Sequence, residues 1–285
     1  MKRDMSQAEA EARRAIEAAL DEIGKQPDAA INLAESALTL ASLDVPELKL
    51  DPYRRHLAAL VRDVAGVMAD PTAESRTAAL SSVIAARWGY KGDSDNYDDI
   101  ANAALPRVID RRKGLPVSLG VLYIHVARGE GWPIAGLNFP GHFLVRLEGR
   151  DGERLILDPF NGGRILGIDE LRRLLKVAEG MDAELMPEHY EPVTNRDILL
   201  RLQNNLRMRL FRMGEVRRAA SVTESMLRLA PLETALWREA GVLYAELGEV
   251  GSAISALERF LDSSGSDTAR HQAAALLQKL RGSLH

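Results

Sequence analysis

Residues 114–123 read GLPVSLGVLY, residues 138–146 read NFPGHFLVR, and residues 158–163 read DPFNGG. The first stretch opens an apolar helix, because Pro116 suits the first helical position, where its missing N–H costs no hydrogen bond. Short runs of strand-forming residues follow at 134–139, 142–147 and 154–157. A helix followed by a small antiparallel meander predicts an α+β unit.

The same three stretches contain Ser118, His142 and Asp158. Ser118 falls in the first turn of the helix, where free backbone N–H groups and the helix dipole favour a developing negative charge. His142 begins one predicted strand and Asp158 ends the next, so we expect paired strands to place the two side chains next to each other. A nucleophile, a base and a carboxylate that orients the base are the parts of an acyl-transfer site.

This order of helix, strand and strand resembles the transglutaminase-like (papain-like) fold, in which a cysteine at the helix start forms a triad with a histidine and an aspartate. Together with Asn96, Tyr97 and Asn102, the three stretches are similar to the SirB-type proteins of bacteria. In these proteins a transglutaminase-like domain precedes tetratricopeptide repeats. The resemblance covers about residues 30–285 and implies a triad position for the serine, with the histidine and the aspartate as its partners.

The chain has no cysteine, which excludes a thiol nucleophile, a disulfide and a thiolate metal site. A hydroxyl at the helix start stays protonated, since its pKa begins far above that of a thiol. Ser118 therefore needs His142 as a general base. Each residue also has a structural interpretation: a first-turn serine satisfies a backbone N–H, a histidine after a glycine forms structural hydrogen bonds, and Asp-Pro opens a turn.

Three further residues are candidates for binding. Asn138 precedes the Phe-Pro-Gly-His run and offers an amide near the expected cleft. Arg111 and Arg112 precede the helix start and would attract an acidic ligand or tail, whereas the alternative is a solvated run of charges. The sequence contains no metal-ligand spacing and no phosphate-binding glycine loop, so we expect neither a metal nor a cofactor.

Both ends of the chain show helical periodicity. The first helix begins after Ser6, its predicted cap. In the last part of the chain, Trp237, Gly241, Tyr244 and Leu257 match the tetratricopeptide spacing, and a second set of matches lies one repeat earlier. These three large side chains and Leu206 of the earlier repeat are expected to be buried between antiparallel helices, and the glycine to lie at a close helix crossing.

The predicted fold class is therefore α+β with a following all-α domain. Residues 1–192 are expected to form a transglutaminase-like domain with N-terminal helices and a small antiparallel sheet, its core lying at about 89–180. Residues 193–285 are expected to form two tetratricopeptide repeats and a capping helix.

The composition argues against two classes of partner, nucleic acids and membranes. The formal net charge is −4, from 37 basic and 41 acidic residues, so there is no excess of positive charge to neutralise a phosphate backbone. No stretch approaches the ~20 apolar residues of a membrane span, and the first residues lack the apolar region of a signal peptide. We expect a cytoplasmic protein that binds neither nucleic acid nor membrane.

These observations favour a protein-interaction module, noncatalytic or regulatory, built on a degenerate transglutaminase-like domain with tetratricopeptide repeats. A protein or peptide partner would bind through the repeats and the cleft. One alternative is a serine-dependent hydrolase or amidase that uses Ser118, His142 and Asp158. Another is a scaffold that works through the repeat surface alone. The missing thiol favours a protein that is not an enzyme, and the sequence leaves the oligomeric state open.

Overall fold

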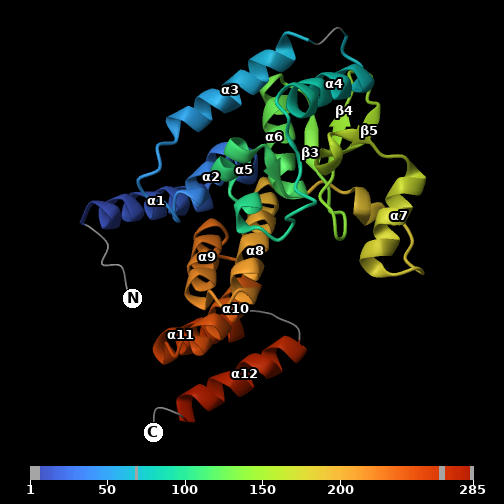
Figure 1. Cartoon of the computed structure of the whole chain (residues 1–285). Coiled ribbons are helices and arrows are strands. Elements are labelled where there is room, and N and C mark those ends of the chain that lie inside the picture. Colours follow the sequence, from blue (N-terminus) through green and yellow to red (C-terminus); the bar gives the residue numbers. More distant parts are fainter. Residues whose placement is uncertain (1–6, 68–69, 263–266, 283–285) are drawn as a thin grey trace. The chain divides into compact units, whose positions relative to one another are not determined.

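The computed structural model describes residues 7–67, 70–262 and 267–282 (Figure 1). The predicted cap residue Ser6 lies outside these ranges. The described residues form two compact units, one within Met1–Gln26 and Gln203–His285 and the other within Pro27–Leu202. The division between the units falls inside α8, Asn195–Arg212.

The unit within Pro27–Leu202 is built around α6, Pro116–Gly129. Nearly every residue of α6 is buried, because the helix is apolar on all sides and other elements surround it. The α-helices of this unit are α2 (Leu33–Ala41), α3 (Asp51–Ala65), α4 (Ala73–Leu80, continued by π-helical turns Ser81–Arg87), α5 (Leu105–Arg111), α6, α7 (Ile168–Glu179) and the first part of α8.

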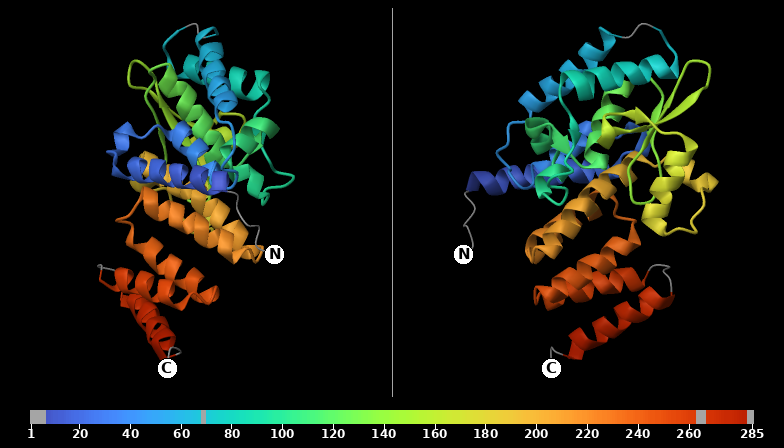
Figure 2. Two further views of the ribbon diagram at one scale, coloured as in Figure 1. Left: turned by 90° about the vertical axis from the view of Figure 1, so that its left-hand side faces the viewer. Right: turned by 45° about the vertical axis from the view of Figure 1, so that its right-hand side comes forward.

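An antiparallel sheet lies against α6 (Figure 2). Its strands, in spatial order, are β3 (Ile134–Gly136), β4 (Val145–Glu148), β5 (Arg154–Asp158) and β6 (Arg164–Ile165). A parallel bridge also joins β1 (Lys91–Gly92) to β2 (Lys113–Gly114). The predicted α+β class with its antiparallel meander is confirmed.

The strand expected to begin at His142 starts three residues later, at Val145. The reason is the turn before it, in which Gly141 has a left-handed φ of 66° and the His142 N–H donates to the Pro140 carbonyl at 2.8 Å. That turn occupies the backbone of His142, so the residue precedes β4 instead of pairing within it.

The other unit is helical and has a repeated turn. Its helices are α1 (Gln7–Lys25), the second part of α8, α9 (Val216–Leu229), α10 (Thr234–Glu246), α11 (Val250–Leu261) and α12 (Asp267–Gly282). Gly214 ends α8 with a φ of 75°, and Gly248 ends α10 with a φ of 71°. These glycines are one tetratricopeptide period apart, so α8–α9 and α10–α11 are equivalent hairpins followed by a capping helix. The predicted repeats are confirmed.

Two of the large repeat side chains are less enclosed than expected. Leu257 is buried, but Trp237 and Tyr244 remain partly exposed. Their polar ends explain this, since each needs a hydrogen-bond partner near solvent. The Trp237 Nε1–H donates to the Pro231 carbonyl at 3.3 Å, and the Tyr244 hydroxyl donates to Glu224 at 2.8 Å.

The close crossing expected at Gly241 is present and gives a test of the repeat packing. A Cβ atom at Gly241 would lie 2.7 Å from Cγ of Leu257, so Gly241→Leu overpacks the contact between α10 and α11. We expect a loss of about 1–3 kcal/mol in the free energy of unfolding, measured by urea denaturation. Gly251→Leu is the control, because a Cβ atom there meets nothing within 4 Å. Equal midpoints for the two variants would contradict this packing.

Helix α1 packs against α9 and so belongs with the repeats. Arg13 donates to the Ser221 hydroxyl at 2.7 Å, and Arg228 pairs with Asp21 at 2.7 Å. At Gly24 the two helices touch so closely that a Cβ atom would overlap the backbone carbonyl oxygen of Arg228. Among all helices in the described ranges, none is long and apolar enough to cross a membrane.

Candidate functional site

The structure brings His142 and Asp158 together. The Nε2 atom of His142 lies 2.8 Å from Oδ1 of Asp158. Antiparallel pairing of β4 with β5, in which Val145 lies opposite Leu157, brings the two residues close, because Asp158 directly follows Leu157 and His142 lies in the turn three residues before Val145. The aspartate side chain is 1% exposed and the histidine side chain 17% exposed. The carboxylate is therefore shielded from solvent, whereas the imidazole is partly accessible to it.

The Asp158 carboxylate also organises the turn that follows it. Its Oδ1 accepts from the backbone N–H groups of Phe160 at 3.1 Å and Asn161 at 3.3 Å, and its Oδ2 accepts from the Asn161 side-chain amide at 2.6 Å. Burial by itself would raise the pKa of Asp158, but hydrogen bonds from His142 and Asn161 outweigh burial and hold that pKa below its usual value. The carboxylate is therefore ionised at neutral pH.

Aromatic rings and an arginine hold His142 in place. The Phe160 ring meets the imidazole edge-on at 6.0 Å between centroids, and Tyr97 meets Phe160 in the same way at 5.9 Å. Arg201 donates from Nη2 to the His142 carbonyl at 2.8 Å and to the Phe139 carbonyl at 3.2 Å. These supports were not predicted from the sequence, although Phe160 and Tyr97 are among the residues that carry the resemblance. No sequence signal points to Arg201.

Ser118 is the third residue of α6 and is completely buried, with 0% exposure. Its Oγ atom donates toward two backbone carbonyls, that of Asn102 at 2.8 Å and that of Leu115 at 3.0 Å. Gly114 closes the remaining side, since a Cβ atom there would lie 2.6 Å from Oγ. Across the described residues, no hydrogen bond joins Ser118 to His142. The single hydroxyl proton is thus directed at carbonyl oxygens.

The orientation of the His142 ring differs from that in the serine-protease triad. In that triad the carboxylate holds Nδ1 and leaves Nε2 to the serine. Here the carboxylate contacts Nε2, and Nδ1 lies on the other side of the ring. Among the described residues Nδ1 has no hydrogen-bonding partner.

The geometry fits what comparison with known proteins shows. A family model described as the transglutaminase-like superfamily matches residues 51–204, and a tetratricopeptide-repeat model matches residues 206–278. The chain belongs to the transglutaminase-like superfamily.

The relatives are UPF0162 proteins and SirB1 proteins of bacteria. A UPF0162 protein of Xylella fastidiosa (strain Temecula1) is 34% identical over 241 residues, which cover 82% of this chain and 84% of that protein. A UPF0162 protein of Pseudomonas aeruginosa is 31% identical, covering 81% and 83%. Protein SirB1 of Salmonella typhimurium is 28% identical, covering 66% and 70%. The SirB-type resemblance of the sequence is confirmed.

The other predicted binding residues of this SirB-type chain contact different groups, and none of their hydrogen bonds or ion pairs joins them to His142 or Asp158 in the described part of the chain. Asn138 is exposed, and its backbone N–H donates to the Glu191 carbonyl at 3.0 Å. Arg111 pairs with the buried Asp93 at 2.8 Å and with Asp99 at 3.1 Å, so internal carboxylates neutralise its charge. Arg112 contacts rings and a histidine instead of an acid. No group of three or more His, Asp or Glu side chains arranged to hold a metal occurs in the described part of the chain.

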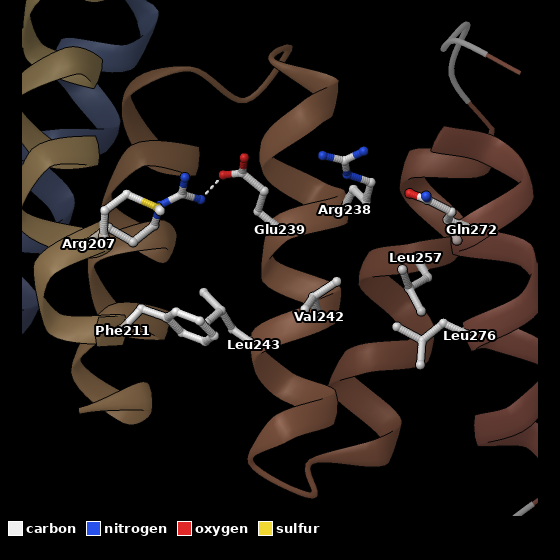
Figure 3. A pocket seen from close by; sticks show the side chains of 11 residues that line it. Arg207, Phe211, Arg238, Glu239, Val242, Leu243, Leu257, Gln272 and Leu276 are labelled. Atoms are coloured by element: carbon white, nitrogen blue, oxygen red, sulfur yellow. Dashed lines mark ion pairs between the residues drawn. The ribbon is translucent and has the colours of Figure 1, made fainter. Parts of the chain in front are cut away.

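The repeats carry a groove of about 460 Å³ (Figure 3). Its apolar lining includes Phe211 of α8, which is 45% exposed, and Val242 of α10, which is also 45% exposed. An ion pair between Arg207 and Glu239 lies at one side of the groove, and Arg238, which also comes from α10, projects next to Glu239. The sequence predicts a partner at the repeats but does not point to these residues.

Proposed function

We propose that this SirB-type protein acts without catalysis, as a regulatory protein that binds a protein partner. The observation that carries this proposal is the enclosure of Ser118, whose hydroxyl is buried and directed at the carbonyls of Asn102 and Leu115. A serine nucleophile needs a base within hydrogen-bond reach of its proton and needs access to a carbonyl carbon. The buried hydroxyl has carbonyl acceptors in place of the base.

The second candidate function is a serine hydrolase or amidase, and the His142–Asp158 pair favours it. The same pair has a structural role, since the carboxylate also caps the turn after β5. The noncatalytic function accounts for both the pair and the buried serine, whereas a hydrolase requires the serine side chain to leave its two carbonyls.

Labelling with a broad fluorophosphonate probe separates the two functions. We expect wild-type protein and Ser118→Ala to show the same background labelling, because the hydroxyl has no base and no access. The readout is in-gel fluorescence after incubation at neutral pH, with a known serine hydrolase as the positive control. Labelling that is strong in the wild type and absent in Ser118→Ala would overturn the noncatalytic proposal in favour of the hydrolase.

The proposed partner is a peptide segment held in the groove of the repeats. Its apolar side chains would cover Phe211 and Val242, which remain exposed although they line a groove. An acidic residue of the segment would pair with Arg238, which has no carboxylate partner among the described residues. A cytoplasmic location and the absence of a nucleic-acid partner belong to the same proposal, and the net charge of −4 supports the latter.

Selection from a displayed random-peptide library tests this partner chemistry on the full chain. We expect the recovered peptides to combine bulky apolar residues with Asp or Glu. Val242→Asp should weaken their binding by about tenfold or more, because it places a charge in the apolar lining. Leu232→Asp is the matched control, since Leu232 is exposed and lies outside the lining. Peptides that bind both variants equally would place the partner elsewhere.

A further inference from the structure

A second pocket, of about 400 Å³, lies between the start of α3 and the end of α5. Its polar lining comes from Lys49, Tyr53, His56, Asp110 and Arg112. Two of these side chains are cationic and one is anionic, so the lining carries an excess of positive charge. Lys49 is exposed and has no partner among the described residues.

Arg112 holds its charge with neutral partners only. The guanidinium lies 5.2 Å from the Trp88 ring centroid and 4.8 Å from that of Tyr90. Its Nη1 atom donates to His56 Nε2 at 2.8 Å and to the Tyr90 hydroxyl. Among the described residues no carboxylate lies within ion-pair distance of it. A half-buried cation without a counterion favours binding of an anion from solution.

The backbone at Arg112 is also unusual. The residue ends α5 in a left-handed conformation, with φ 58° and ψ 23°, and among the described non-glycine residues it alone has a positive φ. Glycine is the usual residue at such a helix end. An arginine in a strained position is retained where its side chain is needed, and such conflicts concentrate at functional sites.

The remaining polar side chains of the pocket, His56, Asp110 and Tyr53, do not neutralise its two cations. Because His56 Nε2 accepts from Arg112, this imidazole is neutral and carries its proton on Nδ1. Burial, followed by the charge of Arg112, lowers the pKa of His56 to about 4, which keeps it neutral at physiological pH. The Asp110 carboxylate accepts from the Tyr53 hydroxyl at 3.2 Å. The Nε and Nη2 groups of Arg112, which form one edge of the guanidinium, and the Lys49 ammonium thus remain to bind an oxyanion.

We propose that this pocket binds a phosphate group, with Arg112 and Lys49 as its charged ligands. A dianion matches two cations better than a carboxylate does, and the guanidinium fork suits its oxygens. The volume exceeds that of a phosphate group, which leaves room for an organic group esterified to it. The site is separate from the His142–Asp158 pair and does not depend on the proposed function.

The test is isothermal titration calorimetry on the full chain with inorganic phosphate, glycerol 3-phosphate and acetate at matched ionic strength. We expect saturable binding of both phosphates and much weaker binding of acetate. A higher affinity for glycerol 3-phosphate would identify a phosphomonoester as the ligand, and equal affinities would identify phosphate alone. No saturable binding of either phosphate would overturn the proposal.

Variants assign the binding to this pocket. Lys49→Ala should weaken phosphate binding by about tenfold, since it removes one charged contact from an exposed side chain without affecting folding. Arg112→Gln should abolish it, with the fold checked by circular dichroism. Lys279→Ala, at an exposed lysine of α12, is the matched control and should bind as the wild type does. Binding that survives Lys49→Ala unchanged would overturn the proposal, even if Arg112→Gln fails to fold.

Discussion

Asp158→Ala is expected to destabilise the unit within Pro27–Leu202 by about 3–5 kcal/mol. The carboxylate accepts hydrogen bonds from His142, from two backbone N–H groups and from the Asn161 amide, and its side chain is almost fully buried. Truncation leaves these donors unpaired, and a buried donor without a partner costs more than its bond contributes. Urea denaturation followed by circular dichroism measures the loss.

The control for this prediction is Asp182→Ala, at an exposed aspartate. It should change the free energy of unfolding by less than about 0.5 kcal/mol. If both alanine variants unfold at the same urea concentration as the wild type, the carboxylate does not hold the turn after β5.

The same carboxylate gives the stability a dependence on pH with a definite sign. Its pKa is lower in the folded chain than the ordinary aspartate value of 3.8, so the folded state binds its proton less readily than the unfolded state does. The contribution of Asp158 is complete above that ordinary value and is lost as pH falls through the folded value. Asp158→Asn should therefore remove part of the loss of stability that the wild type shows below about pH 4.

Gly24→Ala is expected to detach α1 from α9. The added methyl group would overlap the backbone carbonyl oxygen of Arg228, which cannot move aside as a flexible side chain would. Loss of the contact exposes Leu20, which is fully buried, so we expect a cost of about 2–3 kcal/mol. Hydrogen exchange should show faster exchange of the α1 amides than in the wild type.

Gly251→Ala is the matched control, because a methyl group on this helical glycine meets nothing within 4 Å. Alanine has the higher helix propensity, so this variant should be as stable as the wild type or more stable, by up to about 1 kcal/mol. Unchanged protection of α1 in Gly24→Ala would contradict the packing described for α1 and α9.

The sequence predicted the contacts between segments that lie close together in the chain. Pro116 and the apolar run after it predict the start of α6, and two strands joined by a hairpin turn predict that residues 142 and 158 meet. Partners distant in the chain have no such signature. The carbonyl that accepts from Ser118 belongs to Asn102, and a backbone acceptor looks the same in any residue type. Arg111 was expected to face solvent or a ligand for the same reason, because nothing near it in sequence points to Asp93.

The periodicity of a helix likewise gives no information about partners distant in the chain. The apolar spacing of α1 indicates which of its faces is covered, but not which helix covers it. The small residue that permits the contact, Gly24, has a second interpretation as a helix end, and only the structure shows the carbonyl of Arg228 against it.

The pairing of α1 with α9 has a consequence for synthesis on the ribosome. Translation produces α1 first and then the whole of Pro27–Leu202 before α9 begins to emerge. At ~5–20 residues per second this interval lasts about 10–40 s. Throughout that time the side of α1 that packs against α9 has no native partner. During synthesis α1 must therefore avoid aggregation and irreversible binding to chaperones until the repeats have been translated.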